Sequence, residues 1–217
     1  MPVLLDLDDT LVDRSGAFAC WAAEAVPAWG GDAADIEWLL RADGRGRTPR
    51  EVLAQGIIDR FPAAGSDVDG LVAVLRREVV ARNDCYPGVV ARLRELADLG
   101  EALIVVTNGD AWQQRATIER TGLADLVTGT VISGALGVKK PDARIFAAAR
   151  EIAGPGRITR MVGDDIEADM AGGRAVGLET AWVAHGRPWT AAWSPTLQGR
   201  DPAYVLAAVA RAIRDAA

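Results

Sequence analysis

Apolar residues along the chain follow two kinds of pattern. In the first kind, short runs rich in Val, Ile and Leu show little alternation with polar residues, which is typical of strands covered on both faces of a parallel sheet. These runs occupy residues 3–8, 102–109, 160–165 and 180–186, with a weaker one at 126–133. We therefore expect a parallel β-sheet whose strands come from distant parts of the sequence.

In the second kind of pattern, apolar residues recur every three or four positions, which indicates amphipathic helices. Such segments lie between the expected strands, at residues 87–100, 142–154 and 201–215. Gly154 closes the second segment, in the position where helices commonly end. Strands that alternate with helices predict an α/β fold with a Rossmann-like parallel-sheet core domain.

Residues 14–85 differ from the rest of the chain, because they contain helical patterns and no convincing strand. A helical block of this length, placed after the first strand, predicts an inserted α-helical domain. The α/β core domain is then expected to comprise residues 1–13 and 86–217.

Two local signals refine the expected helical domain. Thr48 and Glu51 stand in capping-box positions with Pro49 in the first turn, which predicts a helix that begins there. The tryptophans of this domain are expected in its hydrophobic core: Trp21, Trp29 and Trp38.

Composition narrows the classes of function. The formal net charge of −6 disfavours nucleic acid and anionic membrane as partners, since both reward clustered Lys and Arg. Nothing resembles a signal peptide and no apolar run is long enough to cross a bilayer, so we expect a cytoplasmic protein. Cys20 and Cys85 are expected to be reduced. His185 is the single histidine, so acid–base chemistry must fall to carboxylates and lysine.

Polar side chains follow three of the strong strand runs. Asp6 and Asp8 follow the first run, Thr107 and Asn108 the second, and Asp164 the fourth in chain order. The carboxyl ends of parallel strands share one edge of a sheet, where open α/β folds bind their ligands. Three carboxylates that converge there would repel one another unless a cation separates them, and oxygen ligands suit Mg²⁺. We therefore expect a magnesium site at this edge.

These residues resemble the motifs of the haloacid dehalogenase superfamily of Mg²⁺-dependent aspartyl phosphatases. "DLDDTL" is similar to the first motif of that family and "VVTNG" to the second. Lys140, before the proline of "GVKKPDARIF", matches the third, and "VGDDIEAD" matches the fourth. The helical insertion falls between the first two motifs, where subfamily I carries a C1-type helical cap. The resemblance places the chain in the phosphatase branch of that subfamily.

The resemblance implies a mechanism for the first and fourth motifs. Asp6 would be the nucleophile that attacks phosphorus. Asp8 would protonate the leaving oxygen and then activate water. Mg²⁺ would be held by Asp6, by the backbone carbonyl of Asp8 and by Asp164.

The other motif residues would support this chemistry. By resemblance, Thr107, Asn108 and Lys140 would hold the phosphoryl oxygens in the transition state. Asp169 would orient Lys140. Asp165 would either contact the metal through a water molecule or cap a helix. Lys139 is expected to be a surface residue.

The expected cap also contributes candidates. Arg45 and Arg47, flanked by glycines in "ADGRGRTPREVL", could reach a substrate anion, although a solvated basic loop explains them equally simply. A cap of this kind would exclude water and select the leaving group.

The leading hypothesis is a phosphatase for a small phosphorylated metabolite, most plausibly a nucleoside monophosphate or a sugar phosphate, acting as a monomer or weak homodimer. A 2-haloacid dehalogenase is disfavoured by Asp8, because a departing halide needs no proton. A sugar phosphomutase is disfavoured because no histidine follows Asp13 in "RSGAFACWAAEAV". A non-catalytic binding protein would be expected to have lost some of the motif residues.

Overall fold

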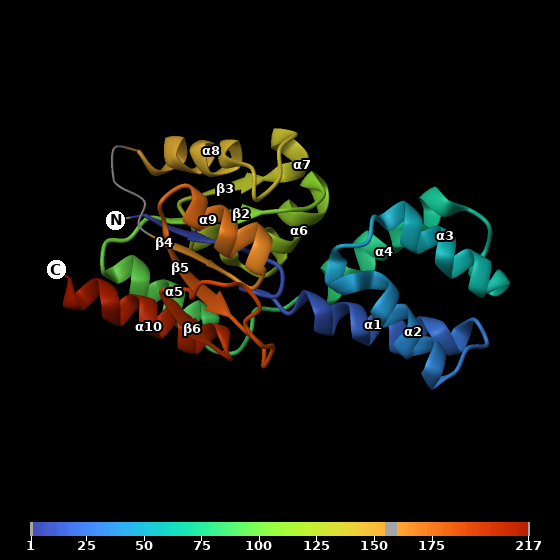
Figure 1. Cartoon of the computed structure of the whole chain (residues 1–217). Helices are drawn as coiled ribbons and strands as arrows, with labels where there is room; N and C mark the ends of the chain where they lie inside the picture. Colours follow the sequence, from blue (N-terminus) through green and yellow to red (C-terminus); the bar gives the residue numbers. More distant parts are fainter. Residues whose placement is uncertain (1, 155–159, 217) are drawn as a thin grey trace. The chain divides into compact units, whose positions relative to one another are not determined.

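The structure is a computed structural model that describes residues 2–154 and 160–216. The chain separates into two compact units (Figure 1). The α/β unit contains Met1–Val12 and Cys85–Ala217, and the helical unit contains Asp13–Asp84. The chain passes between them next to the limits that the sequence suggested at residues 13 and 86. Each unit is described by itself.

A six-stranded parallel sheet forms the centre of the α/β unit, in the order β3-β2-β1-β4-β5-β6. The strands are β1 (Val3–Leu5), β2 (Leu103–Thr107), β3 (Gly129–Ile132), β4 (Arg160–Gly163), β5 (Glu179–Val183) and β6 (Leu197–Gly199). The predicted α/β class with a Rossmann-like parallel sheet is confirmed. Strand β6 was not predicted, because its three residues carry a single large apolar side chain and lie at the sheet edge.

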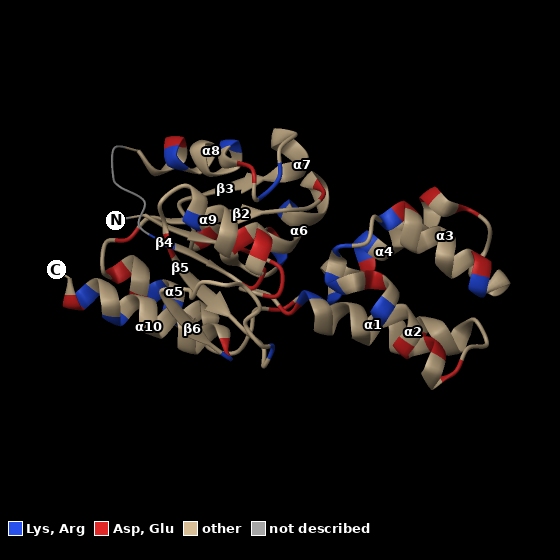
Figure 2. Ribbon diagram, in the orientation of Figure 1, with Lys and Arg blue, Asp and Glu red and all other residues tan. Residues whose placement is uncertain are grey.

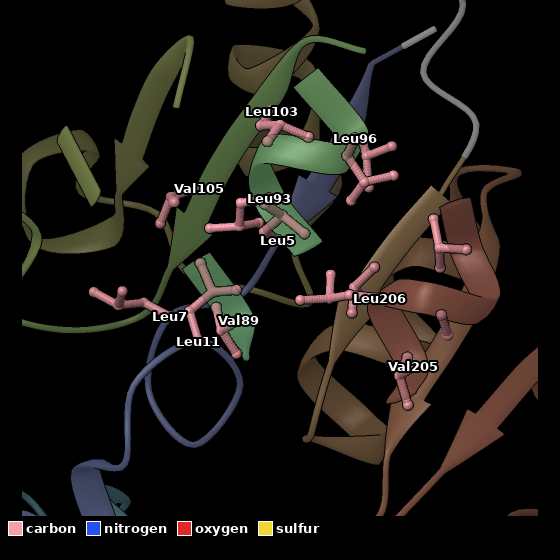
Figure 3. Packing of buried hydrophobic residues seen from close by; sticks show 14 of the residues in the cluster. Leu5, Leu7, Leu11, Val89, Leu93, Leu96, Leu103, Val105, Val205 and Leu206 are labelled. Carbon is pink, nitrogen blue, oxygen red and sulfur yellow. The ribbon is translucent and has the colours of Figure 1, made fainter. Parts of the chain in front are cut away.

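Successive residues of the central strands serve two hydrophobic cores, because side chains alternate between the faces of a sheet. Leu5 and Val105 belong to one core, whereas Leu4 and Ile104 belong to the other. Helices α5 (Val89–Asp98) and α10 (Pro202–Asp215) pack on the first face (Figure 3). Helix α8 (Ala143–Ala153) packs on the second. Burial on both faces explains why these strands read as continuous apolar runs.

Shorter elements connect these layers. They are α6 (Ala111–Arg120), a 3-10 turn (Leu123–Asp125), α7 (Ser133–Leu136), a π-helical turn (Ile166–Ala171) and α9 (Gly172–Ala175). Helix α6 follows β2 directly, and the π-helical turn follows β4. Both therefore begin at the carboxyl ends of the two strands that flank β1 in the sheet.

The helical unit contains four α-helices within its residues: α1 (Arg14–Ala28), α2 (Ala33–Asp43), α3 (Arg50–Arg60) and α4 (Val68–Arg82), with 3-10 turns at Gly44–Gly46 and Pro62–Ala64. Its own hydrophobic core includes Trp21, with Trp29 and Trp38 packed against it, as predicted. Acidic and basic residues are interspersed over its helices rather than gathered on one of them (Figure 2).

The predicted helix begins at Arg50, next to Pro49, but the predicted capping box is absent. The N-cap of α3 is Pro49 and makes no side-chain capping bond. Thr48 Oγ1 instead donates to the carbonyl oxygen of Ala42 at 2.6 Å. The hydroxyl thus binds a carbonyl oxygen at the end of α2 and does not cap the start of α3. The local spacing of residues in the sequence does not predict this contact.

Among the described residues, no helix is both long enough and apolar enough to cross a membrane.

Candidate active site

Asp6 stands directly after β1, and contacts from three sides fix it. Its side chain accepts hydrogen bonds from Thr10 Oγ1 at 3.0 Å and from Lys140 Nζ at 2.6 Å. Its backbone N–H donates to the carbonyl oxygen of Val162 at 2.9 Å, which ties it to β4. The residue is 7% exposed, so these contacts hold a buried carboxylate.

Asp8 and Thr107 are brought together by a residue that the sequence analysis did not single out. Gln114 Nε2, on α6, donates to Asp8 Oδ2 at 3.0 Å and to Thr107 Oγ1 at 2.7 Å. Gln114 is 106 positions from Asp8 in the chain. The structure therefore joins the ends of β1 and β2 through one side-chain amide.

Asn108 holds the backbone of Lys140. Its Nδ2 donates to the Lys140 carbonyl oxygen at 3.0 Å, and its Oδ1 accepts from the Lys140 N–H at 2.8 Å. Both ends of the amide are thus engaged with main chain. Because the side chain is engaged in this way, any contact of Asn108 with phosphoryl oxygens would have to come from its backbone. That contact stays a prediction.

Lys140 is buried among oxygens at the end of β2. Its Nζ lies 2.6 Å from Asp6 Oδ1, 2.6 Å from the Val106 carbonyl oxygen and 2.7 Å from Asp169 Oδ1. An ammonium group has three N–H donors, and three oxygens surround it here. Burial alone would lower the pKa of Lys140, but the charges of Asp169 and Asp6 outweigh burial and raise that pKa above its usual value. Lys140 is a fixed cation, whereas Lys139 is exposed, as expected.

Asp164 follows β4, and the loop after β5 holds it. Arg187 Nη2 donates to Asp164 Oδ2 at 3.0 Å and to its carbonyl oxygen at 2.8 Å, and Trp182 Nε1 donates to the same carbonyl at 2.9 Å. Burial raises the pKa of Asp164 well above its usual range, the negative charges of Asp6 and Asp169 add to the rise, and Arg187 opposes it.

Asp169 is 1% exposed and lies in the π-helical turn after β4. Its Oδ2 accepts from the Asp165 N–H at 3.0 Å, while Oδ1 faces Lys140. Burial raises the pKa of Asp169 to about 7, and the charge of Lys140 offsets only part of that effect. The ion pair agrees with the prediction that Asp169 orients Lys140.

Asp165 caps the π-helical turn. Its Oδ1 accepts from the N–H groups of Glu167 at 2.8 Å and Ala168 at 2.9 Å. Of the two roles that the sequence left open for Asp165, the structure shows the cap.

The carboxylates fit a divalent metal ion. One oxygen from each of Asp6, Asp164 and Asp169 lies within 4.8 Å of the others, and all three residues are buried. Three carboxylates here are paired with only two cations, Lys140 and Arg187, so the cluster keeps a net negative charge. A hard cation with oxygen ligands, such as Mg²⁺, would remove this excess of negative charge. The cluster contains Asp169 and does not contain the Asp8 carboxylate.

Comparison with known families agrees with this geometry. The sequence model of the haloacid dehalogenase-like hydrolases matches residues 3–177. The chain belongs to the haloacid dehalogenase-like hydrolase family. The match covers the strand ends that carry Asp6, Thr107 and Asp164, together with the whole helical unit.

Individual members of the family are similar to the chain over different lengths. Pyrimidine 5′-nucleotidase YjjG of Escherichia coli is 42% identical over 114 residues, which are 51% of this chain and 50% of that protein. Phosphoglycolate phosphatase of Caulobacter vibrioides is 28% identical over 200 residues, which are 85% of this chain and 79% of that protein. The chain thus matches only about half the length of YjjG.

A solved structure supports the fold. The HAD-hydrolase YfnB of Bacillus subtilis superposes with a TM-score of 0.76 at 20% sequence identity, covering 98% of this chain and 97% of that one.

In this haloacid dehalogenase-like hydrolase, Arg45 and Arg47 lie in the helical unit, whereas the acidic cluster lies in the α/β unit. Arg45 is half-buried with a φ of 59°, and Arg47 is exposed. Close by in the helical unit, Asp43 accepts from Arg14 Nη2 at 2.6 Å and from Arg50 Nη1 at 2.8 Å. The loop that carries the two predicted arginines is therefore anchored by a buried acid.

Sequence reasoning missed two site residues, Gln114 and Arg187, which contact Asp8 and Asp164. His185 lies in the turn after β5 and places Nε2 2.7 Å from the Asp9 carbonyl oxygen. A carbonyl oxygen only accepts, so Nε2 carries the hydrogen. A weak signal existed for Gln114, which lies one helical turn beyond the Thr107–Gly109 motif.

Proposed function

We propose that this haloacid dehalogenase-like hydrolase is a Mg²⁺-dependent phosphatase that acts on a small phosphorylated metabolite through an aspartyl-phosphate intermediate. The observation that carries the proposal is the buried Lys140, which is bound to both Asp6 and Asp169 beside a third buried carboxylate. This arrangement offers a nucleophile, a fixed cation for phosphoryl oxygens and ligands for a metal. The phosphatase and nucleotidase names of the relatives support the reaction class.

Asp6 is the proposed nucleophile because Thr10 and Lys140 hold its carboxylate at the carboxyl end of β1. One of its oxygens attacks phosphorus and forms a P–O bond, and the bond from phosphorus to the leaving oxygen breaks. Asp8 gives its carboxyl proton to that oxygen, and the product alcohol departs. Asp8 then takes a proton from the water that attacks the aspartyl-phosphate, which releases phosphate and restores Asp6.

Lys140 would hold a phosphoryl oxygen as negative charge moves during transfer, with Thr107 and the backbone of Asn108 as further donors. Asp169 keeps the ammonium group in place. Asp6, the backbone carbonyl of Asp8 and Asp164 would hold Mg²⁺, with Asp165 beyond the direct ligands. The metal, when bound, would neutralise the carboxylates and draw charge from the phosphoryl group.

The helical unit, predicted from the sequence as residues 14–85, is the proposed cap domain. The α/β core of residues 1–13 and 86–217 is the proposed catalytic domain. Arg45 and Arg47 are the proposed contacts of the cap with a substrate anion. Gly44 and Gly46 both have positive φ values, a conformation that glycine adopts readily, and they flank Arg45 in the short 3-10 turn that leads to the exposed Arg47.

Nucleoside monophosphates and sugar phosphates are the proposed substrates. YjjG is named as a pyrimidine nucleotidase and the Caulobacter protein as a phosphoglycolate phosphatase, so relatives of similar core sequence act on different leaving groups. The leaving group is therefore expected to be chosen outside the shared core motifs.

The proposal is tested by measuring phosphate release from a panel of nucleoside monophosphates, hexose phosphates, acylated sugar phosphates and phosphoglycolate. Wild type with Mg²⁺ is expected to release phosphate from at least one of them, and EDTA is expected to abolish release. Asp6→Asn removes the nucleophile and should abolish release as well. Asp32→Asn is the matched control, since Asp32 is an exposed helix cap in the helical unit and asparagine caps about as well.

The same panel separates the alternatives. A 2-haloacid in the panel tests the dehalogenase, and a sugar monophosphate whose phosphoryl group has moved to another hydroxyl, with no free phosphate, would indicate a phosphomutase. Folded wild type that releases phosphate from nothing in the panel would refute the proposal and favour a binding protein. Release that survives in Asp6→Asn would refute the aspartyl mechanism alone.

A further inference from the structure

We propose that Gln114 is a positioning residue that aims the acid–base group Asp8 at the leaving oxygen. The inference rests on the proposed phosphatase function and assigns to that reaction a residue outside its motifs. Gln114 is 1% exposed, and its side chain is enclosed between the ends of β1 and β2.

The start of α6 sets the direction of this side chain. Asp110 caps the helix and accepts from the N–H groups of Trp112 and Gln113, both at 3.0 Å. The cap fixes the first turn, and Gln114 follows one residue later. Its Nε2 then reaches Asp8 Oδ2 at 3.0 Å, Thr107 Oγ1 at 2.7 Å and the Asn108 carbonyl oxygen at 3.4 Å. An amide nitrogen has two hydrogens, and the two short contacts use them.

Gly109 provides the space for the amide. A Cβ atom at Gly109 would lie 2.9 Å from Gln114 Cδ and 3.0 Å from its Nε2. Any larger residue would push the amide away from Asp8 and Thr107. The loop after β2 and the first turn of α6 are thus matched to each other around this one side chain.

The hydrogen bonds decide which atoms of the neighbours can donate. Asp8 Oδ2 accepts from Gln114, so in the proposed acid step Oδ1 is the oxygen that carries the proton of Asp8. Thr107 Oγ1 also accepts from Gln114, so its own hydrogen is directed elsewhere, toward an acceptor such as a phosphoryl oxygen. One amide therefore orients two donors for the same substrate.

This role predicts an effect that depends on the leaving group. Transfer to Asp6 breaks the bond between phosphorus and the leaving oxygen, and an alkyl oxygen needs the Asp8 proton because an alkoxide is a poor leaving group. A nitrophenolate oxygen leaves without a proton. The value of kcat/KM reports steps up to the first irreversible one, whereas kcat also includes attack by water on the aspartyl-phosphate, which needs Asp8 as base for every substrate.

The test compares Gln114→Met, which keeps the side-chain length and removes the donor, with wild type on p-nitrophenyl phosphate and on the best alkyl phosphate of the panel. We expect the ratio of kcat/KM for the alkyl over the aryl substrate to fall at least about tenfold, since general acid catalysis contributes factors of about 10² to 10⁴. We also expect kcat for the aryl substrate to fall. Gly109→Ala, which displaces the amide, should shift the ratio in the same direction.

Gln113→Met is the matched control. Gln113 is the neighbouring residue of α6 and is 6% exposed, and its side chain bonds to neither Asp8 nor Thr107 among the described residues. Its ratio should equal that of wild type. An unchanged ratio in folded Gln114→Met, with both substrates reduced alike, would overturn the positioning role. Wild type that hydrolyses neither substrate would instead overturn the proposed function.

Discussion

Each unit of this protein buries a group of charged side chains, and the two groups are balanced in opposite ways. In the helical unit a single carboxylate, Asp43, receives two guanidinium groups and the N–H of Gly46 at 2.8 Å. In the α/β unit three clustered carboxylates share one ammonium group, on Lys140, and one guanidinium group, on Arg187. The carboxylate of the first group has more than one cation as partner, whereas the second group has more carboxylates than cations and carries excess negative charge.

The pKa shifts express this difference. Burial would raise the pKa of Asp43, but Arg14 and Arg50 more than reverse it and hold the pKa below its usual value. Burial raises the pKa values of Asp164 and Asp169 and is not reversed. A buried charge group with its own counterions stabilises a fold, while an unbalanced one indicates a place where a cation and a charged ligand bind. The comparison leads to four predictions.

The largest effect is expected from Lys140→Met, which removes the ammonium group from the unbalanced group. Removing one partner of a buried ion pair costs about 3–5 kcal/mol, and phosphate release should be lost together with this stability. Urea unfolding followed by circular dichroism measures the free energy. Lys139→Met removes an exposed lysine next to it and should change little. Wild-type stability in Lys140→Met would show that the group is not held by this lysine.

A smaller loss of stability is expected from Asp43→Asn, in the charged group of the helical unit. Two guanidinium groups would face a neutral amide, and we expect about 3 kcal/mol of destabilisation. Because the chain has two units, unfolding should be followed both by Trp fluorescence and by circular dichroism, so that separate transitions are recognised. Asp59→Asn, at an exposed acid, is the control. A loss below about 1 kcal/mol would mean that the arginines find other partners.

Asp164→Asn should act in the opposite direction. Without metal, removal of one carboxylate from the unbalanced group is expected to raise stability, because burial and the charges of Asp6 and Asp169 disfavour the ionised form of Asp164. With Mg²⁺ at about 100 times its dissociation constant, wild type should gain about 2.7 kcal/mol, and the variant should gain little. Thermal melts in EDTA and in Mg²⁺ measure both. An equal Mg²⁺ effect in the variant would exclude Asp164 as a ligand.

The smallest effects are expected in the dependence of stability on pH. The folded pKa of Asp43 lies below 3.8, so its contribution is complete above about pH 4 and is lost as the pH falls through the folded value. The difference in unfolding free energy between wild type and Asp43→Asn should shrink in that range. The folded pKa of Asp169 is raised from 3.8 to about 7, so metal-free stability should decline as the pH rises between these values. If the contributions of Asp43 and Asp169 to the unfolding free energy changed with pH in the same direction, the contrast between the two charged groups would be contradicted.

Much of the fold could be predicted because burial leaves a local pattern. The strand around Leu4 is apolar on both faces, and the helix that ends at Gly154 shows both its period and its stop. Strand β6 has no such pattern, because it has only three residues at the edge of the sheet and none of them is fully buried. Thr48 showed a capping pattern that the fold used differently.

The candidate site could be predicted only as far as its residues sit at strand ends. Asp6, Thr107 and Asp164 follow buried runs, and the topology of a parallel sheet brings such positions together. Gln114 and Arg187 could not be predicted in this way, because their roles arise from contacts with residues far away in the chain. Asn108 was placed at the site, but its amide proved to support the backbone of Lys140.

The junction between the two units has a consequence for how such proteins diverge. Val12 and Cys85 form an antiparallel bridge, and the Asp13 N–H donates to the Asp84 carbonyl oxygen at 3.0 Å, so the chain leaves and re-enters the α/β unit at adjacent points. An insertion with paired ends can lengthen, shorten or be exchanged without a change in sheet register. Selection could therefore replace the whole intervening gene segment while the strand that carries Asp6 stays in place.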